Sequence, residues 1–256
     1  MHEIETLKNF LSFPISSTVD IFNEFRKLEN NIFREADTTG KQRFLYIEGS
    51  RENKVLLVAH ADTFYDEYYS YPPQHHTLVC DSEVITAKDE NGNPQLLGAD
   101  DRAGIAMLWL LKDSGHSLLI TDGEEDKQIG SKWLMNSNTD IATRINENHQ
   151  FMLQLDRRNA HDYKCYHVGT DKFRKFIHEK TSYKDAGKSA CTDICTLCQN
   201  VCGVNLSVGY YEEHGTFESL HIQKWLSTFN TVKNLISDNL PKFLLLVEEN
   251  STMCFY

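Results

Sequence analysis

The chain lacks a long apolar run. No stretch of its 256 residues approaches the roughly 20 apolar residues that a membrane-spanning helix needs. The first five residues, MHEIE, provide neither the basic region nor the apolar region of a secretory leader. These absences argue against a membrane protein and against export, so a cytoplasmic location is the simplest expectation.

Positive charge is also scarce. Lys and Arg together number 26 against 37 Asp and Glu, which gives a formal net charge of −11. An acidic balance of this kind disfavours nucleic acid or an anionic membrane as a partner and suits a site that binds cations. Internal repeats, low-complexity tracts and an obvious linker are missing as well. We therefore expect residues 1–256 to form a single domain.

The seven cysteines are an odd number in a chain without a secretory leader, and this indicates reduced thiols rather than a disulfide framework. The spacing of Cys191, Cys195 and Cys198 resembles the iron–sulfur motif of radical enzymes that cleave S-adenosylmethionine. With Cys202, however, the positions advance by 4, 3 and 4 residues, which is one stripe of the helix predicted over about 192–201. The ends of that stripe would lie ~16 Å apart, too far to share one zinc ion with bonds of about 2.3 Å. We predict a packed helix face, with an iron–sulfur protein as the competing class.

Short apolar segments alternate with helical patterns along the chain. The segment 102–111 is apolar almost all round, which predicts a helix packed on both sides. Further helices are expected at about 17–30, 171–180, 192–201 and 219–238. Four segments have the character of buried strands: Lys54–Ala59, Ser117–Thr121, Phe151–Leu155 and Val204–Val208. This alternation predicts an α/β fold, a three-layer sandwich whose mixed, mostly parallel central sheet is flanked by helices.

A potential metal ligand follows each of these four strands. His60 and Asp62 follow the first, Glu124 and Glu125 the second, Asp156 the third and His214 the fourth. Because the carboxyl ends of parallel strands share one edge of the sheet, we expect these side chains to converge. Asp100, at the start of the apolar helix, joins the set.

Any one of these acids could be an ordinary solvated residue or a helix cap. Several carboxylates gathered in one cleft need a counter-charge, because each unpaired buried ion costs several kcal/mol. Arg102, Arg157 and Arg158 are too few to offset that charge. A pair of divalent metal ions would be sufficient, and histidine with carboxylate is a ligand mixture that zinc accepts.

The ordered set, with Asp100 inside GADDRAG and the adjacent Glu124-Glu125 pair, resembles the co-catalytic zinc exopeptidases. That superfamily includes zinc aminopeptidases, tripeptidases and glutamate carboxypeptidase-like enzymes, and the resemblance covers about residues 55–218. Only 57 residues separate Asp156 from His214, where the carboxypeptidase branch carries a dimerisation domain. The chain is therefore closest to the single-domain aminopeptidase branch, and we expect no inserted lid or dimerisation domain.

The resemblance implies a role for each residue. Asp100 would bridge two zinc ions, with the other ligands divided between them: His60 and Asp156 on one ion, Glu125 and His214 on the other. Asp62 would orient the ring of His60, and Glu124 would be the general base.

Two of these positions have alternatives. Asp101 is the bridge if the register slips by one residue. His221 is the last ligand if His214 is not, because Gly215 follows His214 where the family usually has threonine.

The implied activity is that of a two-zinc metallohydrolase, with cobalt or manganese as possible substitutes for zinc. Water activated by the metals would cleave a peptide or small amide substrate, most simply as an aminopeptidase-type exopeptidase. An amidohydrolase acting on N-acyl amino acids or small amides is the alternative within the enzyme class. A binding module that kept the fold and lost turnover is the alternative outside it. The sequence leaves the oligomeric state open.

Overall fold

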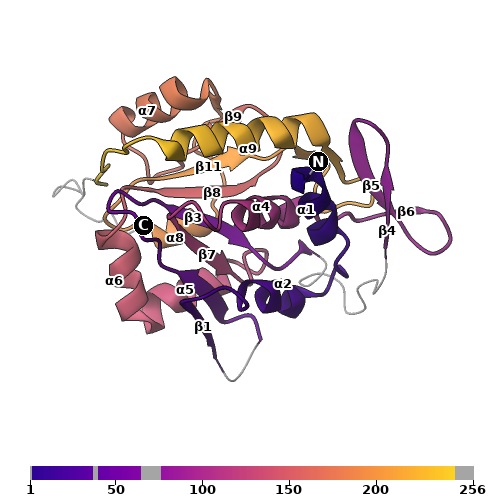
Figure 1. The fold of residues 1–256 in the computed structure, drawn as a ribbon, viewed down its shortest axis with the longest axis horizontal. Coiled ribbons are helices and arrows are strands. Elements are labelled where there is room, and N and C mark those ends of the chain that lie inside the picture. The colour runs from indigo at the N-terminus through magenta and orange to yellow at the C-terminus, as the bar shows by residue number, and fades with distance from the viewer. Residues whose placement is uncertain (1, 37–39, 65–75, 246–256) are drawn as a thin grey trace, which may run out of the picture.

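A computed structural model describes residues 2–36, 40–64 and 76–245, and its centre is an eight-stranded sheet. The strand order is β1-β2-β7-β3-β8-β11-β9-β10 (Figure 1). Its middle consists of four adjacent parallel strands: β7 (Ser117–Thr121), β3 (Leu56–His60), β8 (Met152–Arg157) and β11 (Gly203–Ser207). These are the four strands predicted from the apolar segments, so the predicted sheet is confirmed.

Shorter strands complete both edges of this sheet. On one side β2 (Arg43–Ile47) runs antiparallel to β7, and β1 (Asn31–Glu35) runs antiparallel to β2. On the other side β9 (Asp162–Lys164) is antiparallel to β11, and β10 (Lys184–Asp185) is parallel to β9. These four strands were not predicted from the sequence, and the sheet that they complete is mixed as expected.

Helices cover both faces of the sheet, which confirms the three-layer prediction. One face carries α1 (His2–Leu11), α2 (Thr18–Phe25), α4 (Ala99–Leu110), α7 (Asp171–Thr181) and α9 (Ile222–Ser237). The other carries α5 (Ile129–Ser137), α6 (Thr139–Glu147) and α8 (Asp193–Leu197) (Figure 1). Strand β3 shows why two layers are needed: Leu57 and Ala59 pack in the first core, and Leu56 and Val58 pack in the second. Among the described residues, no helix is long and apolar enough to cross a bilayer.

A second, smaller sheet lies beside the sandwich and was not predicted. Its strand order is β12-β13-β5-β4, with β6 (Pro94–Gln95) paired to β5. The strands are β12 (Tyr210–Tyr211), β13 (Ser219–His221), β5 (Val84–Lys88) and β4 (Thr77–Cys80). Pairing of β12 with β13 holds the loop 212–218 over the carboxyl end of the main sheet, and this loop carries His214.

The cysteine stripe is not a helix face, and that prediction is wrong. Helix α8 ends at Leu197, and Cys198 has an extended backbone with ψ 110°. The cause is the buried side chain of Asn146: its Nδ2 donates to Leu197 O, and its Oδ1 accepts the N–H groups of Gln199 and Asn200. Of the four cysteines only Cys195 lies within the helix, while Cys191 is exposed and Cys198 and Cys202 are buried.

Candidate metal centre

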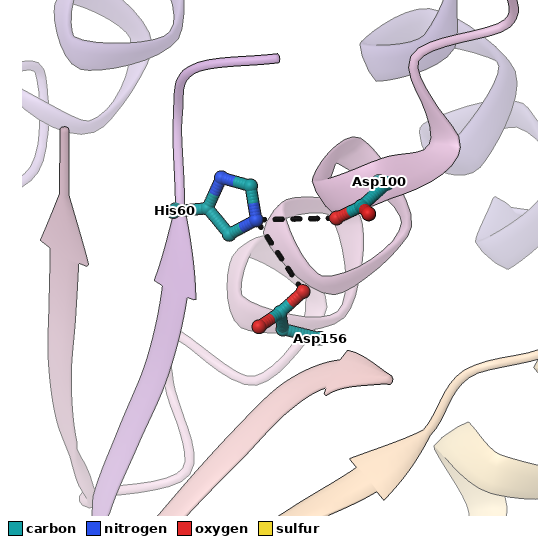
Figure 2. Close-up of side chains that lie close together, drawn as sticks. All are labelled: His60, Asp100 and Asp156. Carbon is teal, nitrogen blue, oxygen red and sulfur yellow. Dashed lines mark hydrogen bonds and ion pairs between the residues drawn. The ribbon is translucent and has the colours of Figure 1, made fainter. Parts of the chain in front are cut away.

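Three of the predicted ligands meet at the carboxyl ends of β3 and β8 and at the start of α4. His60 Nε2 lies 3.2 Å from Asp100 Oδ1 and 3.3 Å from Asp156 Oδ1 (Figure 2). His60 is the last residue of β3, and Asp156 follows the part of β8 that pairs with β3. Sheet pairing therefore places His60 and Asp156 together, and the irregular backbone at the start of α4 brings in Asp100, whose φ and ψ are −84° and 101°.

The second group shares Asp100. His214 Nε2 lies 3.2 Å from Asp100 Oδ2 and 2.9 Å from Glu125 Oε1. The ring of His214 is stacked on Phe64, with centroids 4.4 Å apart and an interplanar angle of 8°. The two oxygens of Asp100 thus face different histidines, which is the arrangement of a carboxylate that bridges two ions.

The residues present fit divalent ions such as zinc. Within each group, His60-Asp100-Asp156 and Asp100-Glu125-His214, one ligand atom per residue lies within 4.8 Å of the others. Tetrahedral zinc with bonds of about 2.0–2.1 Å places its ligand atoms roughly 3.3 Å apart, close to the 3.2 and 3.3 Å measured around His60. Glu125 Oε1 is buried and accepts no well-aligned hydrogen bond from a described residue.

The raised pKa values of the buried groups also favour bound divalent cations. Burial and the charge of Asp100 raise the pKa of Glu125 to about 7, and burial raises that of Asp156. Burial opposes the charged form of His214, yet the neighbouring carboxylates of Asp100 and Glu125 raise its pKa to about 11. So much negative charge in one buried place holds protons on neighbouring groups, and divalent ions would displace them.

Asp62 contacts both the ring of His60 and the backbone of the Glu124-Glu125 pair. Its Oδ1 lies 3.2 Å from His60 Nδ1 and accepts the backbone N–H of Glu124 at 3.2 Å. Its Oδ2 accepts the backbone N–H of Glu125 at 3.1 Å. A buried carboxylate in this position fixes the orientation of the His60 ring and the backbone of the glutamate pair.

Glu124 lies outside both ligand groups and lines the same cavity as Asp100, Glu125 and Asp156. The cavity has a volume of about 330 Å³. Burial and the charge of Asp156 raise the pKa of Glu124 well above its usual range. A carboxylate that faces the cavity without belonging to a ligand group can accept a proton there.

The structure separates the alternatives left by the sequence. Asp101 is turned away from the groups, because its Oδ2 accepts the N–H of His60 at 3.2 Å and its Oδ1 that of Gly104 at 3.1 Å. His221 packs its ring against Tyr211, with centroids 4.9 Å apart, and belongs to neither group. The geometry therefore favours Asp100 over Asp101 and His214 over His221.

The role of Glu218 was missed. This carboxylate is buried, and it accepts three backbone N–H groups, those of Leu97, Gly98 and Asp100, at 3.1, 2.7 and 3.0 Å. Burial raises its pKa to about 8. The available signal was its place four residues after His214, where the resembling family ends its motif with an acid.

A further set of side chains orients Asp156. Gln154 Nε2 and Thr192 Oγ1 each donate to Asp156 Oδ2 at 2.8 Å, and Asn205 Oδ1 accepts the N–H of Asp156 at 3.0 Å. Arg102 does not take part, because its guanidinium donates to the carbonyls of residues 13–15. Polar groups rather than arginines therefore surround this carboxylate.

No protein-family model matches the chain, and a search of curated proteins finds no match. Solved structures match it well. A tripeptidase from Staphylococcus aureus has a TM-score of 0.66 at 15% identity, covering 91% of this chain and 96% of its own. The aminopeptidase PepT from Bacillus cereus has a TM-score of 0.63 at 14% identity, covering 91% and 97%. A protein described as a zinc-dependent exopeptidase from Bacteroides vulgatus has a TM-score of 0.53 at 14% identity, covering 92% and 93%.

These structural neighbours are named as peptidases, and the chain shares their fold, which is the fold that the resemblance implied. At 14–15% identity the likeness is one of fold. The roles of individual residues rest on the geometry of this chain.

Proposed function

We propose that this protein is a metal-dependent hydrolase that cleaves peptide or small amide bonds, with two zinc ions per chain, as an aminopeptidase-type exopeptidase. The ligands would be His60, Asp100 and Asp156 for one ion and Asp100, Glu125 and His214 for the other. The observation that carries the proposal is the division of Asp100, with Oδ1 3.2 Å from His60 Nε2 and Oδ2 3.2 Å from His214 Nε2. A structural carboxylate has no need to face two histidines from two different segments in this way.

When bound, the two zinc ions would lower the pKa of a shared water toward neutrality and polarise the scissile carbonyl. Glu124 takes a proton from the attacking water and returns it to the leaving nitrogen. Asp62 keeps His60 in one tautomer through its contact with Nδ1 and keeps Glu124 and Glu125 in place through their backbone N–H groups. The adjacent glutamates thereby divide into one metal ligand and one base.

Metal-dependent hydrolysis is the test. The chelated protein is compared with the zinc-loaded protein on three groups of substrates: aminoacyl p-nitroanilides, dipeptides and tripeptides, and N-acyl amino acids. The proposal expects zinc-dependent release of the N-terminal residue. Cleavage confined to N-acyl amino acids would establish the amidohydrolase alternative, and no cleavage of any amide by zinc-loaded protein would indicate a binding module.

We further propose that residues 1–256 act as one catalytic domain without an inserted lid or dimerisation domain, in the cytoplasm. Limited proteolysis of the zinc-loaded protein tests the domain organisation. One cooperative, protease-resistant body is expected, and a stable fragment that lacks part of the ligand set would contradict it.

A further inference from the structure

The wall of the cavity next to the candidate metal centre is basic. Arg157, Arg158 and Lys164 line the cavity together with the carboxylates of the centre. Two of these cations have partners: Arg157 forms an ion pair with Asp162 at 2.8 Å, and Arg158 one with Glu213 at 2.5 Å. Lys164 is the cation whose charge needs an explanation.

Sheet register directs Lys164 toward the centre. In the antiparallel pair of β9 and β11, Lys164 lies directly opposite Asn205, and directly opposite residues project from the same face of a sheet. Asn205 Nδ2 lies 3.5 Å from Asp156 Oδ2 and 3.3 Å from Tyr166 Oη, and Lys164 Nζ lies 5.9 Å from the centre of the Tyr166 ring. The ammonium group of Lys164 is thus on the same face of the sheet as the candidate metal ligand Asp156, and β11 lies between their two strands.

The Lys164 ammonium is buried, and its hydrogen-bond partners among the described residues are uncharged. The residue is 8% exposed, and its Nζ donates to Ser189 O at 2.9 Å and Ser189 Oγ at 3.2 Å, both uncharged. Across the described ranges, no carboxylate oxygen lies within the 4.0 Å of an ion pair from this Nζ. An ammonium carries three donors, so one remains for a ligand in the cavity. Burial and the charges of Arg157 and Arg158 lower the pKa of Lys164, against a smaller opposing effect of Asp162.

The candidate metal ions do not remove this need. Four carboxylates of the centre line the cavity, and two divalent ions would balance them. Glu213, the remaining acid in the lining, is paired with Arg158. With the metals bound, the carboxylates that line the cavity would be balanced and Lys164 would still form no ion pair, so an anionic group in the cavity would stabilise it.

We propose that Lys164 binds a substrate carboxylate, so that the preferred substrates are small amides with a negative charge close to the scissile bond. This rests on the proposed function and names the substrate class of the same site. A cavity of about 330 Å³ is at the small end of ligand pockets, which suits a substrate of dipeptide size. The carboxylate has two sources, the C-terminus of a short peptide or an acidic side chain.

The test compares kcat/KM for matched substrates that differ only in that charge. Ala-Ala against Ala-Ala-amide reports the C-terminal carboxylate, and Glu-p-nitroanilide against Gln-p-nitroanilide reports an acidic side chain. For one of these pairs the wild type is expected to prefer the charged member about 10- to 100-fold, the range of a charge-assisted hydrogen bond. Lys164→Met should bring that ratio close to 1, and Lys164→Arg should restore part of it. Lys172→Met removes an exposed charge on α7 and should leave the ratio unchanged.

A wild type with no preference in either pair overturns the assignment, whether or not the variants fold. So does an unchanged ratio in Lys164→Met. To keep this outcome separate from a failure of the proposed function, binding is also measured without turnover, by calorimetric titration of zinc-loaded Glu124→Gln with glycylglycine and glycylglycinamide. Selective binding of the carboxylate by Glu124→Gln, lost when Lys164→Met is added, supports the site even if the wild type cleaves no peptide. Equal binding of the two ligands by Glu124→Gln contradicts it even if the wild type cleaves peptides.

Discussion

Glu218 Oε1 accepts a hydrogen bond from the backbone N–H of Asp100 at 3.0 Å. The other oxygen of Glu218 accepts the N–H groups of Leu97 and Gly98. One buried carboxylate from the loop after His214 therefore holds the segment from which Asp100 projects. The residue proposed to bridge the two ions therefore depends on a residue outside both ligand groups.

Glu218→Gln should weaken metal binding and the fold together. Glutamine keeps one acceptor oxygen, so at least one of the three buried N–H groups loses its partner, at a cost of about 1–3 kcal/mol. Zinc affinity should fall about 10- to 100-fold, the usual effect of losing a residue that supports a ligand. Urea unfolding and competition with a chelator measure the two effects. Glu212→Gln, on the exposed part of the same loop, is the control, and wild-type zinc affinity in Glu218→Gln would show that Glu218 is dispensable.

Glu124→Gln should keep its zinc and lose hydrolysis. Glu124 belongs to neither ligand group, so the metal content stays at the wild-type value, while loss of a general base lowers kcat about 10²- to 10⁴-fold. Metal analysis and peptide hydrolysis are measured on the same preparation. Asp126→Asn makes the same charge change two residues away, at a partly exposed carboxylate paired with Lys41, and should behave as wild type. Substantial turnover by Glu124→Gln would assign the base to another residue.

Asp62→Asn should reduce zinc affinity about 10- to 100-fold. Asparagine offers one acceptor oxygen where Asp62 uses two to contact His60 Nδ1 and the N–H groups of Glu124 and Glu125. Its amide nitrogen can also turn toward the His60 ring and disfavour the required tautomer. Chelator competition measures the zinc affinity, and Asp113→Asn, at an exposed acid in the turn after α4, is the control. Equal affinities in the two variants would mean that His60 needs no such support.

His149 should make the fold sensitive to mild acid. Its Nε2 meets Ser117 Oγ at 2.7 Å and its Nδ1 meets Ile145 O at 3.1 Å, and burial lowers its pKa to about 4. The unfolded chain, with an ordinary pKa of about 6.5, binds the proton first as pH falls. Stability from this group is therefore complete above about pH 6.5 and is lost as pH falls toward 4, by up to about 3 kcal/mol.

Chemical unfolding between pH 4.5 and 7.5 measures this. His149→Gln should be less stable at pH 7.5 and should lose less stability than the wild type on acidification. His167→Gln, at an exposed histidine, should follow the wild-type curve. Parallel curves for wild type and His149→Gln would exclude His149 as the cause.

The central sheet could be predicted from the sequence because its four middle strands are mostly buried and appear as short segments rich in apolar residues. The outer strands could not. Strand β1 has no fully buried residue, and β10 is two exposed residues long. Strand β13 pairs with β5, more than 130 residues earlier, and this pairing converts 219–221 from the expected start of α9 into a strand. Local periodicity contains no information about such a partner.

The candidate site was predictable as far as strand ends determine it. His60 and Asp156 come together because β3 and β8 are neighbours, and the rule about carboxyl ends already placed them at one edge. The stacking of Phe64 on His214 and the three hydrogen bonds to Glu218 depend on how the loops fold over that edge. The end of α8 within the cysteine segment was not predictable either, because it is set by the side chain of Asn146 on α6.

The most direct test of the two-metal claim is an anomalous difference map collected at the zinc absorption edge from crystals of the zinc-loaded protein. Two peaks are expected about 3.5–4 Å apart, one beside Asp100 Oδ1 and His60 and the other beside Asp100 Oδ2 and His214. A single peak, or peaks that Asp100 does not bridge, would contradict it.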